Sequence, residues 1–105
     1  MPKRDLGFKD QTHLLWWLFV ASRGGEMRLR IVEELLKSPA NANQLAGRLS
    51  VNYRTVKHHL DILVDSGLVI AEGPKYGQLY YPSELLLKSI DVIRRMVREA
   101  RGNGP

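Results

Sequence analysis

The stretch Asn52–Gly67, NYRTVKHHLDILVDSG, decides the fold because it carries a complete short helix with both of its end signals. One face of that helix collects apolar residues at spacings of four and three, namely Val56, Leu60 and Leu63. Asn52 is a good N-cap, since its side-chain oxygen can accept from the open N–H groups of the first turn. Gly67 is a good stop, since it takes positive φ without a Cβ penalty. The stretch therefore predicts an amphipathic helix that packs on a core.

The leading end of this helix, residues 52–58, contains no acidic residue. Arg54, Lys57 and His58 fall away from the apolar face. Such side chains suit phosphates and the acceptor-rich edge of guanine, so the leading interpretation is a helix that reads DNA. The plainer alternative is a surface helix whose charges are only solvated, and the helix alone leaves both interpretations open.

Length and composition indicate one soluble globular domain. A chain of 105 residues, 44% apolar and 26% charged, is long enough for a single core and is not expected to be disordered. The 16 Lys and Arg against 11 Asp and Glu give a net charge of +5, which favours a polyanionic partner. The absence of cysteine excludes disulfides, thiolate metal sites and cysteine nucleophiles.

An apolar run near the N-terminus, Leu14–Ala21, follows several basic residues and so imitates a secretory signal. The run has eight residues, far below the ~20 that a membrane-spanning helix needs. We interpret residues 10–22 as a buried helix of a cytoplasmic protein, capped by Asp10 or Thr12. Because this helix is apolar all round, both of its sides should be covered.

The C-terminal helix expected over residues 83–101 repeats apolar side chains at spacings of 4, 3, 4 and 3. A small domain has little interior to cover two such helices, so we expect a homodimer in which both contact a second subunit. The expected interface residues are Leu15, Trp16, Phe19, Leu86, Ile90, Ile93 and Val97. Two alternatives stay open. The N-terminal helix could wrap only its own core, or Trp16, Trp17 and Phe19 could line a pocket for a small apolar ligand.

Residues 26–82 form the expected central module between these helices. Its expected elements are helix Glu26–Lys37, helix Gln44–Leu49, the tight turn Ser50-Val51, the helix after Asn52, and strands Leu68–Glu72 and Gln78–Tyr81. A glycine-bounded loop with Lys75 and Tyr76 at its tip joins the strands. This order is that of a winged helix-turn-helix. The expected fold class is thus mainly α with a small β-hairpin wing, in a single domain spanning residues 1–105, with a dimerisation helix at each end.

The central module resembles the ArsR-type transcriptional regulators. Arg28–Ile31 is similar to the opening of that family's first shared helix, Gln44–Leu49 to its positioning helix, and Thr55–Val69 to its recognition helix and the following strand. The likeness covers roughly Arg28–Tyr81. It implies a homodimeric regulator of transcription that binds specific sequences of double-stranded DNA. Its recognition helix would enter the major groove, and its wing would lie on the backbone or in the minor groove.

Carried over position by position, the resemblance places a set of residues at the DNA surface: Asn52, Tyr53, Arg54, Thr55, Lys57, His58, Lys75 and Tyr76. His59 corresponds to a family histidine that lies against the module, so a core role is expected for it. Tyr53 and Lys57 stand where the family often has smaller or amide side chains. The base sequence that the family reads therefore cannot be transferred to this chain.

Metal ions, cofactors and catalysis are not expected. The family's metal sensors use thiolates beside the recognition helix, or carboxylates and histidines on the last helix, and this chain has no cysteine and no histidine there. His58 and His59 project about 100° apart on a helix and cannot chelate one ion together. Asp61 and Asp65 lie i, i+4 on a solvent face without a nucleophile, a phosphate loop or a metal motif, so we expect no enzyme.

A winged helix used for protein or RNA contact is the remaining alternative, because fold does not determine function. The net charge of residues 51–75 is zero, from Arg54, Lys57 and Lys75 against Asp61, Asp65 and Glu72. The basic character is therefore local to the helix start and the wing. A steep loss of affinity with salt would identify a DNA binder.

Overall fold

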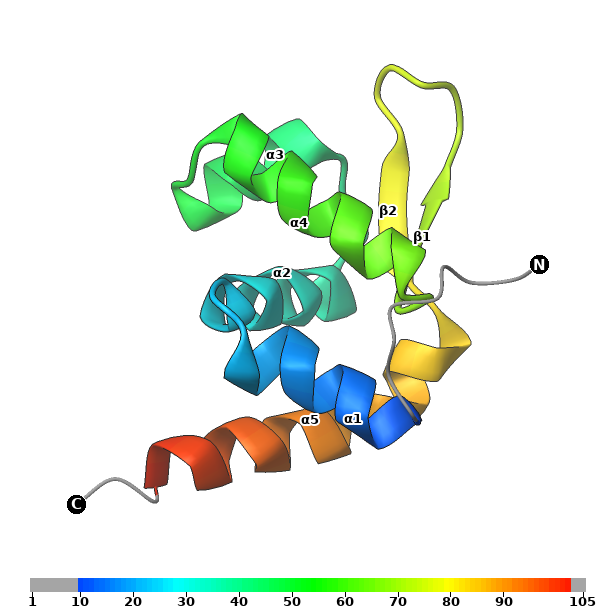
Figure 1. Ribbon diagram of the computed structural model, residues 1–105. Coiled ribbons are helices and arrows are strands. Elements are labelled where there is room, and N and C mark those ends of the chain that lie inside the picture. Colours follow the sequence, from blue (N-terminus) through cyan, green and yellow to red (C-terminus); the bar gives the residue numbers. More distant parts are fainter. Residues whose placement is uncertain (1–9, 103–105) are drawn as a thin grey trace.

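The computed structural model describes residues 10–102 as a stack of helices with a β-hairpin at its side (Figure 1). In chain order the elements are α1 (Gln11–Trp16), the π-helical turn η1 (Trp17–Ala21), α2 (Gly25–Lys37), α3 (Ala42–Leu49), α4 (Tyr53–Asp65), β1 (Val69–Glu72), β2 (Leu79–Pro82) and α5 (Glu84–Gly102). This architecture confirms the predicted fold class. Of the single domain predicted over residues 1–105, residues 1–9 and 103–105 lie outside the described part.

The helices place α3 and α4 at one end of the molecule and α1 and α5 at the other, with α2 between them (Figure 1). The core runs through these layers, and its fully buried side chains include Leu18, Ile31, Leu45, Leu60, Leu63 and Ile93. Burying one such side chain contributes about 1.5–3 kcal/mol relative to leaving it exposed. This shared core is what fixes α4 against the rest of the molecule.

Side-chain caps set where the helices begin. Asn41 and Gln44 form a capping box, in which each side chain accepts from the other residue's backbone N–H at 2.8 Å. For this reason α3 begins at Ala42, earlier than the start predicted at Gln44. Asn52 caps α4 as predicted, because its side chain accepts from the Arg54 N–H at 2.7 Å.

The wing is fastened to the module at its base. β1 and β2 pair in antiparallel register, with Val69 opposite Pro82. Tyr80 also exchanges two backbone hydrogen bonds, of 3.1 and 2.8 Å, with Ala40 in the connection between α2 and α3. This additional bridge holds the hairpin beside α4 (Figure 1).

The apolar N-terminal run forms α1 and η1, which lie along α5 (Figure 1). Of the two caps expected, Asp10 is the one that caps α1, accepting from the His13 N–H at 2.8 Å. Among residues 10–102, no helix combines the length and apolar character needed to cross a membrane.

Most of the residues expected at a dimer interface are covered within the subunit. The seam of α5 faces α1 and η1, and six of the expected residues are only 0–9% exposed: Leu15, Phe19, Leu86, Ile90, Ile93 and Val97. Trp16 differs from them, with 46% of its surface exposed. The structure thus assigns the seam to packing inside one subunit, and a second copy would meet mainly the side chains that flank it.

Gly24 provides a stability test of how closely α4 packs against the start of α2. It precedes α2 with φ +93°, and a Cβ built there would lie 2.6 Å from Cε1 of His59. Gly24→Ala should therefore lower the free energy of unfolding, measured by urea denaturation, by about 1–3 kcal/mol.

Gly47→Ala is the matched control for this substitution. Gly47 lies within α3, where an added Cβ meets nothing within 4 Å. The alanine should leave stability unchanged or raise it by up to about 1 kcal/mol. Equal effects of the two substitutions would contradict a close approach of α4 at Gly24.

Candidate nucleic-acid interface

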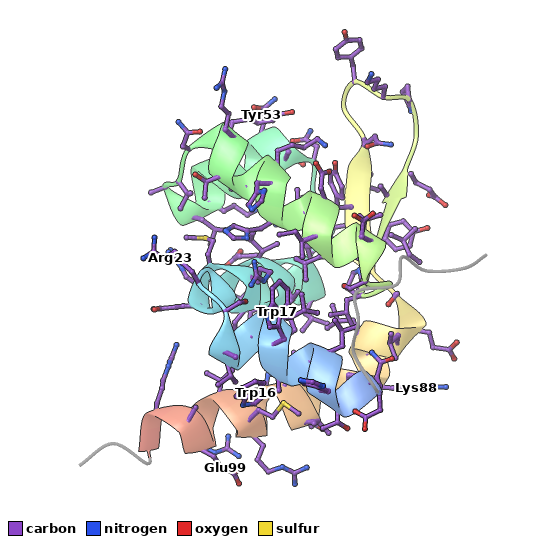
Figure 2. The ribbon with its side chains drawn as sticks, viewed as in Figure 1. Trp16, Trp17, Arg23, Tyr53, Lys88 and Glu99 are labelled. Atoms are coloured by element: carbon purple, nitrogen blue, oxygen red, sulfur yellow. The ribbon has the colours of Figure 1, made fainter. Side chains whose placement is uncertain are left out.

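The start of α4 is an exposed basic end of the molecule. Arg54, Thr55 and His58 are exposed, and Tyr53 keeps 45% of its surface. Figure 2 shows Tyr53 at the opposite end of the molecule from Glu99, which lies on α5. The side chains predicted at a DNA surface on this helix are therefore free to meet a large ligand.

The tip of the wing is the second projection at this end (Figure 1). Lys75 and Tyr76 are both exposed, and Tyr76 keeps 89% of its surface. An aromatic ring that contacts almost nothing in its own chain contributes little to folding. The residues predicted at a DNA surface thus lie on two neighbouring projections, the start of α4 and the wing tip.

A narrow cleft separates the two projections. Its lining comes from the start of α3, from α4 and from the wing, and includes Asn41, Tyr53, Lys57, Lys75 and Tyr80. Lys57 and Lys75 belong to the two facing elements, α4 and the wing. Two cations around one cleft attract an anion.

Lys57 is half-buried, unlike the exposed basic residues Arg54 and Lys75. Its Nζ lies 2.7 Å from Oδ1 of Asp61, one turn along α4. This hydrogen bond is the main reason that the pKa of Lys57 is raised, so the side chain is firmly cationic. Burial raises the pKa of the neighbouring Tyr80 hydroxyl, which therefore stays protonated.

A buried arginine supports α4 from below. The guanidinium of Arg28 on α2 is 2% exposed and donates from Nε to the Leu18 carbonyl at 2.8 Å. Nη1 lies 3.0 Å from Nδ1 of His59 on α4, and Nη2 donates to the Ser22 hydroxyl and, at 3.3 Å, to the Arg23 carbonyl. One side chain therefore ties η1, the loop before α2, and α4 together.

Sequence reasoning placed Arg28 in a helix but missed its role. The available signal was its spacing, since Arg28 precedes Ile31, Val32 and Leu35 by three, four and seven residues and so shares their buried face. Its guanidinium also lies over the ring of Trp17, 5.6 Å from the ring centroid. A basic residue on an apolar row indicates a buried polar network.

His59 has the core role that was predicted for it, with 8% of its surface exposed. A guanidinium only donates hydrogen bonds, so Nδ1 of His59 must accept, and the ring is neutral. Burial, together with the charges of Arg28 and His58, lowers the pKa of His59 from 6.5 to about 4.

The His59 pKa predicts how stability depends on pH. Between pH 6.5 and about 4 the unfolded chain binds a proton at residue 59 that the folded chain does not bind. The stabilisation is therefore complete above pH 6.5 and is lost as the pH falls toward 4, by on the order of 3 kcal/mol. Denaturant unfolding of wild type and His59→Gln across this range measures the difference.

His58→Gln serves as the control because His58 is exposed on the same helix. It should keep most of the wild-type pH dependence, because the charge of His58 is the smallest of the three causes of the His59 shift, whereas His59→Gln should flatten it. A wild-type protein whose stability curve matches that of His59→Gln would contradict the neutral, buried ring.

Within residues 10–102, no group of three His, Cys, Asp or Glu side chains is arranged to hold a metal ion. Asp61 bonds to Lys57, and the rings of His58 and His59 are tilted by 60° with centroids 5.1 Å apart. These potential metal ligands on α4 therefore contact other side chains and do not converge on one point.

A three-helix module with a short turn before an exposed basic helix, and a hairpin anchored beside that helix, defines a winged helix-turn-helix protein. Residues 25–71 match the model of a family described as bacterial regulatory protein, arsR family. This match confirms the resemblance of the central module to that family, over residues 25–71 of the chain. The family is described as one of regulatory proteins and not of enzymes, in agreement with the prediction.

A relative from Methanocaldococcus jannaschii, described as an uncharacterized HTH-type transcriptional regulator, is 36% identical over 63 residues. These residues make up 60% of this chain and 16% of the relative, so most of that protein has no counterpart here.

Solved structures show the same fold. The homodimeric winged helix-turn-helix DNA-binding domain of Mb0332 from Mycobacterium bovis, a possible ArsR-family regulator, has a TM-score of 0.66 at 20% identity, over 84% of this chain and 80% of that one. Reduced HlyU from Vibrio cholerae has a TM-score of 0.62 at 23% identity, over 81% of this chain and 87% of that one.

Proposed function

We propose that this protein regulates transcription by binding specific sequences of double-stranded DNA as a homodimer. The observation that carries this proposal is the acid-free start of α4, exposed on the same end of the molecule as the basic wing tip (Figure 1). In this arrangement α4 enters the major groove, and Lys75 and Tyr76 lie along the backbone or in the minor groove. The two recognition helices of the dimer would sit about 34 Å apart on a pseudo-palindromic site.

The charge distribution supports phosphate contact at these two projections. Arg54 and Lys75 are exposed, and neither has an acidic partner among the ion pairs of residues 10–102. Cations on a DNA-binding surface replace condensed counterions, which gives affinity at any sequence. Base-edge contacts from Tyr53, Thr55 and His58 would then supply the sequence dependence.

The outer face of α1 and α5 is the proposed dimer surface. Trp16 on α1 is 46% exposed, and on α5 Val92 and Met96, four residues apart, are only partly covered. Figure 2 shows Trp16 on the side of α1 that faces α5. Exposed apolar side chains of this size favour a second copy as the occupant, as in the homodimeric Mycobacterium bovis domain.

Packing inside the subunit accounts for the other two aromatic residues considered for an apolar ligand. Phe19 is 3% exposed, and Trp17 lies under the Arg28 guanidinium. Of Trp16, Trp17 and Phe19, this leaves the exposed Trp16 to be explained, and contact with a second subunit explains it more simply than a bound small molecule does.

Removing one cation from α4 tests the DNA contact. Arg54→Ala and Lys57→Ala should each weaken binding to the duplex that the wild-type protein selects from a random pool, by about tenfold, because a contact to DNA is lost. Each should also make the salt dependence shallower by about 0.9 where a phosphate contact is lost. Fluorescence anisotropy at several salt concentrations measures both effects.

Lys88→Ala is the matched control, because Lys88 also faces an acid one turn away, Glu84, but lies on α5, away from Tyr53 (Figure 2). This variant should bind DNA like wild type, and all three variants should unfold near the wild-type temperature. Unchanged affinity in both α4 variants would refute the placement of DNA, and preferred binding of RNA would favour the alternative function.

Trp16→Glu tests the dimer surface. A carboxylate at this exposed position should not unfold the subunit, but it would have to lose its water in a dimer interface. Sedimentation velocity should show a dimer for wild type and a monomer for the variant, with unchanged helical circular dichroism. A dimer that persists in Trp16→Glu would exclude this face.

A further inference from the structure

The ion pair between Lys57 and Asp61 lies on the helix that we propose reads DNA. The two side chains are 38% and 60% exposed, and their charged atoms are 2.7 Å apart. Lys57 also lines the cleft toward the wing, whereas Asp61 lines a second hollow, together with Ala71, Gln78 and Tyr80. The pair therefore occupies the junction between α4 and the wing, where a duplex would lie.

The ion pair between Lys57 and Asp61 is poorly explained as a device that stabilises α4. An acid placed four residues before a lysine stabilises a helix better than the reverse order, and here the lysine comes first. Lys57 is in the second turn of α4, and an exposed ion pair adds little stability on its own.

We propose that Asp61 is a specificity-determining residue, which holds Lys57 back from the phosphates of non-cognate DNA. The proposal rests on the proposed function and assigns to Asp61 a role that opposes affinity. The carboxylate itself contributes no attraction to a polyanion. Because Lys57 is already bonded to Asp61, it must give up this carboxylate before it can contact a group on the DNA.

The exchange is unequal for different DNA sequences. On a non-cognate duplex, Lys57 would trade a hydrogen-bonded carboxylate at 2.7 Å for a solvated phosphate, with little net gain. On a cognate site, it would gain the N7 and O6 acceptors of a guanine, held in register by the rest of α4. The ion pair thus subtracts more affinity from wrong sites than from the right one.

The test compares two duplexes of equal length, the one that wild type selects from a random pool and one of mixed sequence. Asp61→Asn keeps the side-chain shape but removes the charge. It should tighten binding to the mixed-sequence duplex about three- to fivefold and change the selected duplex by less than about twofold. The salt slope on the mixed-sequence duplex should steepen by about 0.9, since Lys57 becomes free to contact a phosphate.

Two controls separate this mechanism from a general charge effect. Glu84→Gln removes one negative charge and breaks the Lys88–Glu84 pair on α5, so it should leave the ratio of the two affinities unchanged. In a Lys57→Gln background, Asp61→Asn should no longer alter that ratio, because the residue it acts through is gone.

Two results would overturn the proposal. One is an Asp61→Asn variant that tightens both duplexes equally, and the other is an effect of the same size in the Lys57→Gln background. Either would mean that Asp61 only repels DNA. If wild type binds neither duplex, the proposed function itself is wrong, and that result is distinct from the other two.

Discussion

One buried guanidinium connects the parts of this molecule that would otherwise be separate. Arg28 donates to the Leu18 carbonyl, to the loop before α2 and to His59 on α4. A buried arginine is tolerated only when its donors are satisfied, and here the partners come from three different segments. The position of α4 relative to the N-terminal helix therefore depends on a polar network as well as on the apolar core.

Charged side chains are unevenly distributed over the surface formed by α4 and the wing. Over residues 51–75 the formal charges cancel. The basic side chains nevertheless lie at the start of α4 and at the wing tip, while Asp61 and Asp65 lie further along α4. A strongly basic module would hold any duplex tightly. If α4 reads DNA as we propose, acidic residues beside the basic ones would weaken binding to every duplex and so help to distinguish among them.

Local signals in the sequence predicted the elements well. The cap Asn52 acts through a neighbouring backbone group, so its effect can be predicted without knowing the fold. The apolar period of α5 predicted a buried seam but not its partner, because burial looks the same whether α1 of the same chain or a second copy covers it. The exposure of Arg54 followed from its place off the apolar face, whereas Tyr53 was expected at the surface only through the family resemblance. The link from Arg28 to His59 spans 31 residues, which no local pattern predicts.

The bridge between Ala40 and Tyr80 has a mechanical consequence. Because the base of the hairpin is bonded to the connection between α2 and α3, the position of the wing is tied to that of the helix-turn-helix. The turn around Gly73 and Gly77 lies beyond this bridge, and both glycines have positive φ and open space around them. A change in the length or residues of that turn would leave the bridged base of the hairpin in place and would alter only what the tip of the wing presents to a partner.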